Sequence, residues 1–197
     1  NPNGRDATGA TALHAAARAG RTEAVTLLLA RGAAVEMRND DGETPLFVAA
    51  EYARLETVRL MLARKADPAA RAAGGATPLH VAAMAGSPFV IDVLIEHGAD
   101  VKAANKGGEQ PLFWAAATGT IDAVRKLLER GAPVNHQDAS GNTALHGAAD
   151  GDHAEVVQVL IAAGANPALR NAARQTALDI ARAREHAGIV RLLAPRP

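Results

Sequence analysis

The chain has 197 residues, and its 21 lysine and arginine residues are balanced by 21 aspartate and glutamate residues, so the formal net charge is zero. That balance argues against a nucleic-acid-binding protein, which normally carries a basic excess or a basic face. The sequence has no cysteine, which excludes disulfides and thiolate sites, and no apolar run approaches the roughly 18 residues of a membrane-spanning helix.

One motif recurs along the chain at a constant spacing. A threonine or its replacement opens the motif every 33 residues, at Thr11, Thr44, Thr77, Gln110, Thr143 and Thr176. A fixed period of this length indicates units that bury their apolar faces only by stacking on their neighbours. We therefore expect the function on a repeated surface rather than in one central pocket.

The period divides the chain into repeats and predicts one continuous domain over residues 1–197. The repeats cover about residues 6–38, 39–71, 72–104, 105–137, 138–170 and 171–197. Asn1-Pro2 occupies the place in the period that Asn166-Pro167 occupies, so residues 1–5 resemble the end of a preceding repeat and we expect more protein before them. At the other end, residues 194–197 are expected to end the last helix.

The third repeat shows how one unit is built. Thr77 is placed to cap a helix, and Pro78 takes the first helical position, where a missing N–H costs nothing. Gly86 is expected to end this first helix in the left-handed conformation. A second helix follows, which Gly98 ends, and its apolar stripe is expected at Val90, Val93, Leu94 and Ile95. The sequence thus predicts an all-α fold of paired antiparallel helices with short hairpin loops.

These motifs resemble the ankyrin repeat over essentially the whole chain. The family's opening Thr-Pro-Leu-His stands at residues 77–80 and recurs with changes at residues 11–16 and 143–148. The closing Gly-Ala-Asp stands at residues 98–100 and, modified, at residues 164–166. The resemblance implies an ankyrin-repeat solenoid that binds other proteins.

The second repeat departs most from the pattern. Ala53 and Lys65 stand where glycines would end its two helices. One interpretation is neutral drift, with turns of another shape; the other is a loosened repeat that adapts to a partner. A left-handed Lys65 would cost on the order of 1–2 kcal/mol.

The fourth repeat replaces the capping threonine with Gln110 and carries Phe113-Trp114. Trp114 is the only tryptophan, and its equivalent in the next repeat is Gly147. We expect the indole to fill the space beside Gly147; the alternative is an exposed Trp114 that anchors a partner.

The recurring histidines do not predict a metal site. His14, His80 and His146 lie two repeats apart, which at roughly 10 Å per helix layer separates neighbours by about 20 Å. The resemblance implies a structural hydrogen-bonding role for them. A tighter group of His146, Asp150, Asp152 and His153 is interpreted as a solvated turn, with metal binding as the alternative.

No signature of catalysis is present. The sequence lacks a phosphate-binding loop of the Walker type, a nucleophile elbow and a paired-carboxylate motif. Ser87 and Ser140, the only serines, are not in a recognisable nucleophile setting. We therefore expect no enzyme activity, no cofactor and no metal.

The resemblance implies that hairpin tips and the exposed sides of the first helices line a concave groove. The residues at these places, which we interpret as a protein-binding set, are Arg38, Asp40, Asp41, Glu43, Glu51, Tyr52, Arg71, Met84, Lys106 and Glu109. Three basic groups against five acidic groups leave a charge of −2, so the groove is mildly acidic. The alternative is that these are solvated surface residues, since Asp40-Asp41 is a good turn by itself.

The sequence thus favours a non-enzymatic, monomeric scaffold that binds a protein or peptide in the groove of repeats two to four. Tyr52 and Met84 are the expected anchors. The alternatives are a structural spacer or cap within a longer array and a metal-binding or enzymatic protein. We expect a soluble chain without membrane insertion, cytoplasmic or exported; its 17 arginines against four lysines suggest a bacterial gene.

Overall fold

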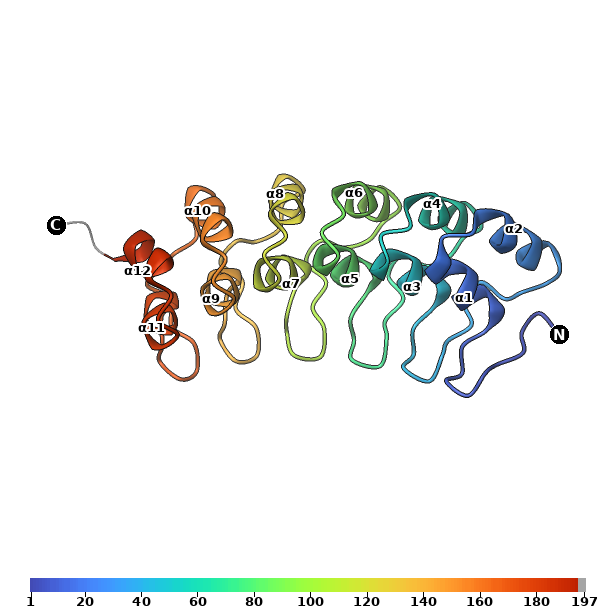
Figure 1. The fold of residues 1–197 in the computed structure, drawn as a ribbon, viewed down its shortest axis with the longest axis horizontal. Coiled ribbons are helices and arrows are strands. Elements are labelled where there is room, and N and C mark those ends of the chain that lie inside the picture. Colours follow the sequence, from blue (N-terminus) through green and yellow to red (C-terminus); the bar gives the residue numbers. More distant parts are fainter. Residues whose placement is uncertain (195–197) are drawn as a thin grey trace. The chain divides into compact units, whose positions relative to one another are not determined.

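The computed structural model describes residues 1–194 and is built from helices (Figure 1). Outside the helices, these residues contain one isolated β-bridge, between Arg5 and Thr11. The predicted all-α fold is therefore confirmed. The twelve helices are α1 (Ala12–Ala19), α2 (Thr22–Ala30), α3 (Pro45–Glu51), α4 (Leu55–Ala63), α5 (Pro78–Met84), α6 (Pro88–Glu96), α7 (Pro111–Ala117), α8 (Ile121–Glu129), α9 (Ala144–Asp150), α10 (Ala154–Ala162), α11 (Ala177–Ala183) and α12 (Ala187–Leu193).

The helices form two compact units, Asn1–Asp100 and Val101–Pro197. In the first unit, α1, α3 and α5 pack in one row and α2, α4 and α6 in a second row (Figure 1). The second unit repeats this arrangement with α7, α9 and α11 in one row and α8, α10 and α12 in the other. The expected end of the last helix is described only as far as Ala194, since residues 195–197 lie outside the described part.

The first helices begin as the motif predicts. Thr77 has the extended backbone of a cap and Pro78 is the first residue of α5. Thr44 caps α3, where its hydroxyl oxygen accepts a bond from the Phe47 N–H at 3.3 Å. Gln110, in contrast, turns its side chain away from α7 and donates to the Lys102 carbonyl at 2.9 Å.

The core is made of leucines on the first helices and of aliphatic residues on the second helices. The motif leucines Leu13, Leu46, Leu79, Leu112 and Leu145 are all buried. In α6, Val90, Val93 and Leu94 are buried as predicted, whereas Ile95 is only half-buried. Ile91, which the predicted stripe omits, is fully buried because α6 packs against both α4 and α5. A helix with two neighbours buries a wider face than one apolar stripe.

The recurring histidines of repeats one and five bond to the next repeat. The Thr11 N–H and hydroxyl both donate to His14 Nδ1, at 3.1 and 2.9 Å, which requires an unprotonated Nδ1. Nε2 of His14 then donates to the Glu43 carbonyl of the next repeat at 3.0 Å. His146 makes the corresponding bond to the Gln175 carbonyl at 3.1 Å. The structural role expected for these histidines is confirmed.

Each full repeat has three left-handed residues: one at the hairpin tip and one after each helix. Most are glycines, and Gly86 (φ 71°) and Gly98 (φ 99°) end their helices as predicted. Ala53 (φ 53°) and Lys65 (φ 64°) keep the same conformation, so the interpretation that the turns of repeat two take another shape is wrong. Three further residues that are not glycine, Asp152, Arg174 and Glu185, also adopt the left-handed conformation, which the sequence did not predict.

Replacing Lys65 with glycine should stabilise the protein. At the equivalent Gly32 and Gly98 an added Cβ would have open space around it, so the cost at Lys65 is the backbone conformation alone. Relief of about 1–2 kcal/mol exceeds the extra entropy cost of glycine, about 0.5–1 kcal/mol, and we expect a net gain of about 0.5–1 kcal/mol. Urea unfolding measures it. Arg64→Gly is the matched control, since Arg64 has φ −95° and gains nothing; an equal effect of both changes would contradict the prediction.

The stability of the fold should decrease as the pH falls below about 6.5. Burial lowers the pKa of His14 and of His146 from 6.5, although their backbone hydrogen bonds oppose the shift. In this pH range the unfolded chain therefore binds protons that the folded chain does not, and folding loses free energy as the pH falls toward the folded pKa values. Urea midpoints at pH 7.5 and 5.5 test this. His14→Gln should reduce the difference between them, and equal midpoints in the wild-type protein would contradict it.

Candidate functional site

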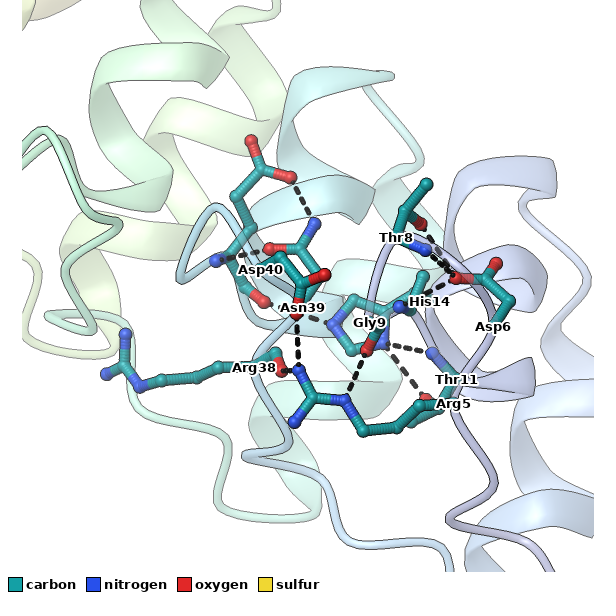
Figure 2. Close-up of polar contacts among 11 residues, drawn as sticks. Arg5, Asp6, Thr8, Gly9, Thr11, His14, Arg38, Asn39 and Asp40 are labelled. Carbon is teal, nitrogen blue, oxygen red and sulfur yellow. Dashed lines mark hydrogen bonds and ion pairs between the residues drawn. The ribbon is translucent and has the colours of Figure 1, made fainter.

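Hydrogen bonds within each hairpin shape the surface beside the first helices. Asp6 Oδ1 accepts bonds from the Thr8 N–H at 2.8 Å, from the Thr8 hydroxyl at 2.7 Å and from the Ala10 N–H at 3.0 Å (Figure 2). These bonds, those from Thr8 foremost, lower the pKa of the Asp6 carboxyl. Asn39 plays the same part in the second hairpin, where its Oδ1 accepts from the Glu43 N–H at 2.8 Å. The hairpins are thus fixed by their own polar side chains.

Backbone bonds join neighbouring hairpins within each unit. The Asp40 N–H donates to the Thr8 carbonyl at 3.1 Å, and the Ala73 N–H donates to the Asp41 carbonyl at 2.8 Å. In the second unit the Ala172 N–H donates to the Ser140 carbonyl at 2.8 Å. Successive hairpin tips therefore keep a fixed register.

Arginines six residues before the motif threonine strengthen this register. Arg5 donates to the Gly9 carbonyl of its own hairpin at 3.0 Å and to the Arg38 carbonyl of the next at 3.1 Å (Figure 2). Arg5 also pairs with the Asp40 carboxylate at 3.0 Å. Arg38 in turn donates to the Gly42 carbonyl at 2.7 Å and to the Arg71 carbonyl. We call these side chains the hairpin arginines: Arg5, Arg38 and Arg71.

The second unit makes the same link with a different residue. Gln137 stands in the place of a hairpin arginine and donates to the Gly141 carbonyl at 2.7 Å and to the Arg170 carbonyl at 3.0 Å. An amide and a guanidinium therefore serve the same purpose. Repeat four has Ala104 at this place, whose side chain cannot donate, so the link forms where a long side-chain donor is present.

These contacts divide the predicted binding set in two. Arg38, Asp40, Glu43, Arg71 and Glu109 are engaged within the protein. Arg38 and Asp40 make the contacts described above, and Arg71 donates to the Gly75 carbonyl at 2.9 Å. Glu43 accepts a bond from Asn39 at 2.7 Å, and Glu109 accepts one from Asn105 at 2.8 Å. Within residues 1–194, no side-chain hydrogen bond or ion pair is formed by Asp41, Glu51, Tyr52, Met84 or Lys106. The second group is the one whose side chains are available to a partner.

Part of this group lies at a groove in the first unit. The groove has a volume of about 670 Å³ and lies between the first two hairpins and helices α1 and α3. We call it the Tyr52 groove; among the residues that line it are Asp6, Thr8, His14, Arg18, Asp41, Glu43, Val48, Tyr52 and Arg54. Tyr52 is 40% exposed, and the Arg18 guanidinium lies 5.2 Å from the centre of its ring. Arg54 donates to the Arg18 carbonyl at 2.9 Å.

The Tyr52 groove is acidic. The carboxylates of Asp6, Asp41 and Glu43 line it, against the cations of Arg18 and Arg54. Glu51 interacts electrostatically with two of these groups: burial and then the charge of Glu43 raise the pKa of Glu51, while the charge of Arg18 opposes them. Glu51 is not among the residues that line the groove, but it lies close enough to Glu43 and Arg18 for their charges to act on it. Arg54 and Val48 line the groove but are absent from the predicted binding set, because the family's exposed places do not include their positions.

The second unit has a smaller hollow of a different kind. Its volume is about 330 Å³, and Phe113, Ala117, Gly147 and Ile180 form much of its wall. A Cβ added to Gly147 would lie 3.2 Å from Phe113 Cε2 and 3.3 Å from Ala117 Cβ. Phe113 therefore occupies the space beside Gly147, and the prediction that Trp114 fills it is wrong.

Trp114 instead lies half-buried, and its indole N–H donates to Glu109 Oε2 at 2.8 Å. The difference follows from helix geometry. Adjacent residues of a helix point about 100° apart, so a shift of one position decides which ring meets the neighbouring repeat. The alternative role of Trp114 as a partner anchor stays a prediction.

The histidines and aspartates of repeat five are engaged separately. His153 Nε2 bonds the Ala117 carbonyl at 3.1 Å, and His146 bonds Gln175 as described above. Asp150 pairs with Arg184 at 2.9 Å rather than with His153. Among residues 1–194 no group of three or more histidine, aspartate or glutamate side chains has the geometry of a metal site. None of the helices in this part of the chain has the length and apolar character that a bilayer crossing requires.

Comparison with known families agrees with the period and the helix pairs. A family model of ankyrin repeats in three copies matches residues 1–72 and 70–138, and one of ankyrin repeats in many copies matches residues 127–181. No curated protein matches the chain. The matched segments cover nearly all of the described helices, and the chain belongs to the ankyrin-repeat family.

Proposed function

We propose that the chain is a non-enzymatic module that binds a protein or an extended peptide on its first helices and hairpins. Ankyrin repeats are generally protein–protein interaction modules and generally non-enzymatic. The observation that carries the proposal is the pair of exposed anchors in the first unit: Tyr52 is 40% exposed and Met84 is 36% exposed. Both stand at the ends of first helices, α3 and α5, and neither is used by the hairpin contacts.

The chemistry of these anchors suits a partner chain. Tyrosine presents a rigid amphipathic ring at low entropic cost, and methionine adapts its shape to the surface that it meets. The hairpins beside them are held by the hairpin arginines, so the surface is ordered before a partner arrives and less ordering free energy is lost on binding. In the second unit, the candidate from the same predicted set is Lys106, whose side chain forms no hydrogen bond or ion pair among residues 1–194.

A structural spacer within a longer array is the alternative proposal. Asn3 supports it, because its side chain bonds the Gly32 carbonyl at 3.2 Å and the Ala34 N–H at 2.8 Å. Asn135 makes the equivalent bonds to Gly164 and Asn166, at 3.1 and 2.7 Å, between two repeats. Residues 1–5 thus contact repeat one as the closing loop of one repeat contacts the next.

Replacing Tyr52 and Met84 together with alanine should weaken binding by about thirtyfold or more, since the loss of even one hot-spot anchor costs about 2 kcal/mol or more. The ligands are peptides selected from a random displayed library against the immobilised full chain. Their affinity is then measured in solution by fluorescence anisotropy, and circular dichroism confirms that the variant is folded.

The matched control removes two exposed apolar side chains from the second helices. Leu27 and Phe89 are 50% and 67% exposed, and Leu27→Ala with Phe89→Ala should leave the affinity unchanged. Equal losses in both double variants, or no loss in the Tyr52/Met84 variant, would refute the placement of the surface. A library that yields no binding peptide would favour the spacer.

A further inference from the structure

We infer that the Tyr52 groove binds a basic segment of the partner, whose lysine or arginine head lies at the carboxylates of Glu51, Asp41 and Glu43. This inference rests on the proposed function and names the chemistry of the ligand. The observation behind it is the Glu51 carboxylate, which lacks the ion-pair partner that its equivalent in another repeat has.

In another repeat, the residue equivalent to Glu51 forms an ion pair. Asp150 stands 99 residues after Glu51, at the same position of a first helix. Asp150 pairs at 2.9 Å with Arg184, which lies at the end of the first helix in the following repeat. The residue that stands in the place of Arg184 relative to Glu51 is Ala85, an exposed residue at the end of α5. Glu51 therefore has the carboxylate of this pair without its cation.

The preceding repeat fills the same two places with a different contact. Arg18 occupies the position of Asp150, and Tyr52 occupies the position of Arg184, and the guanidinium lies 5.2 Å from the ring centre. Side chains at these two places therefore meet within a unit wherever both are large. Glu51 and Ala85 do not meet because alanine is too short.

The arginines near Glu51 are committed to other contacts. Arg18 lies against the Tyr52 ring, and Arg54 donates to the Arg18 carbonyl at 2.9 Å. The hairpin arginine Arg5 pairs with Asp40 and leaves Asp41 without an ion pair among the described residues. Acidic groups still outnumber basic groups around the groove, so its field favours a cation.

The groove also suits the stem of a long basic side chain. Lysine and arginine bury their aliphatic stems on apolar surface while the charged head stays polar, and Tyr52 and Val48 provide such surface. Met84 stands at the Glu51 position of the neighbouring first helix and is exposed. Burial and the charge of Glu43 raise the pKa of Glu51, so a cation at this place relieves repulsion rather than only replacing water.

A gain of charge at Ala85 tests the inference without removing any groove residue. Ala85→Arg should supply the cation that Glu51 lacks, as Arg184 does for Asp150, and should weaken binding of the selected peptides about tenfold. Ala85→Gln adds comparable bulk without charge and should weaken binding much less. The same peptides should be enriched in lysine and arginine relative to the starting library.

Removal of the acidic groups provides the second arm. Asp41→Asn with Glu51→Gln should also weaken peptide binding about tenfold, and added salt should weaken wild-type binding. The matched control, Glu23→Gln with Asp122→Asn, removes the same net charge from exposed places on second helices and should leave the affinity unchanged.

The outcomes separate the two proposals. One outcome would overturn this inference and leave the proposed function standing. In that outcome the selected peptides require Tyr52 and Met84 but are not enriched in basic residues. They also bind the Ala85→Arg and Asp41/Glu51 variants as well as they bind the wild type. Acidic peptides would overturn it in favour of recognition by Arg18 and Arg54. The absence of any binding peptide would overturn both.

Discussion

Three left-handed residues in each full repeat are the constraint on which the rest of the structure depends. They set the places where the chain turns, and so they return it to the same path every 33 residues. Because the path recurs, a long side chain at one place can reach the equivalent carbonyl of the next repeat, as Arg38 and Gln137 do. His14 reaches a carbonyl 29 residues later, and Arg38 reaches one 33 residues later. The non-glycine residues Ala53 and Lys65 accept strain rather than break this register.

The links between repeats also determine which surface groups remain for a partner. Arginine and histidine side chains satisfy the hairpin carbonyls, and Asp6 and Asn39 satisfy the hairpin N–H groups. A polar residue at an exposed place is therefore often part of the fold. Arg38 is the clearest case, because its Nη1 donates to carbonyls of two hairpins.

The sequence predicted the backbone conformation better than it predicted the contacts of the side chains. The helix start at Thr77 and Pro78 and the stop at Gly86 followed from local chemistry and the period. The hydrogen-bonding role of the histidines followed from the family resemblance, and each of these predictions was right. Lys65, Phe113 and Arg38 were not predictable in this way, for three physical reasons. Register can override the conformational preference of a residue, a step of one position redirects a ring by about 100°, and a long side chain chooses among acceptors that lie one repeat away. The omission of Ile91 has a related cause, since the period does not reveal how many helices cover a face.

The most informative polar residues in a repeat protein are then those whose equivalents are paired while they are not. An irregular fold has no equivalent residue with which an unpaired surface carboxylate can be compared, and most surface ion pairs contribute little to stability. Here Asp150 with Arg184 provides the reference, since the same two places hold Glu51 and Ala85 in an earlier repeat. Glu51 and Ala85 are equivalent in the period to Asp150 and Arg184, and they lack the cation that Arg184 supplies. Ala85 provides no cation for Glu51, so a basic side chain of the partner would have to provide it.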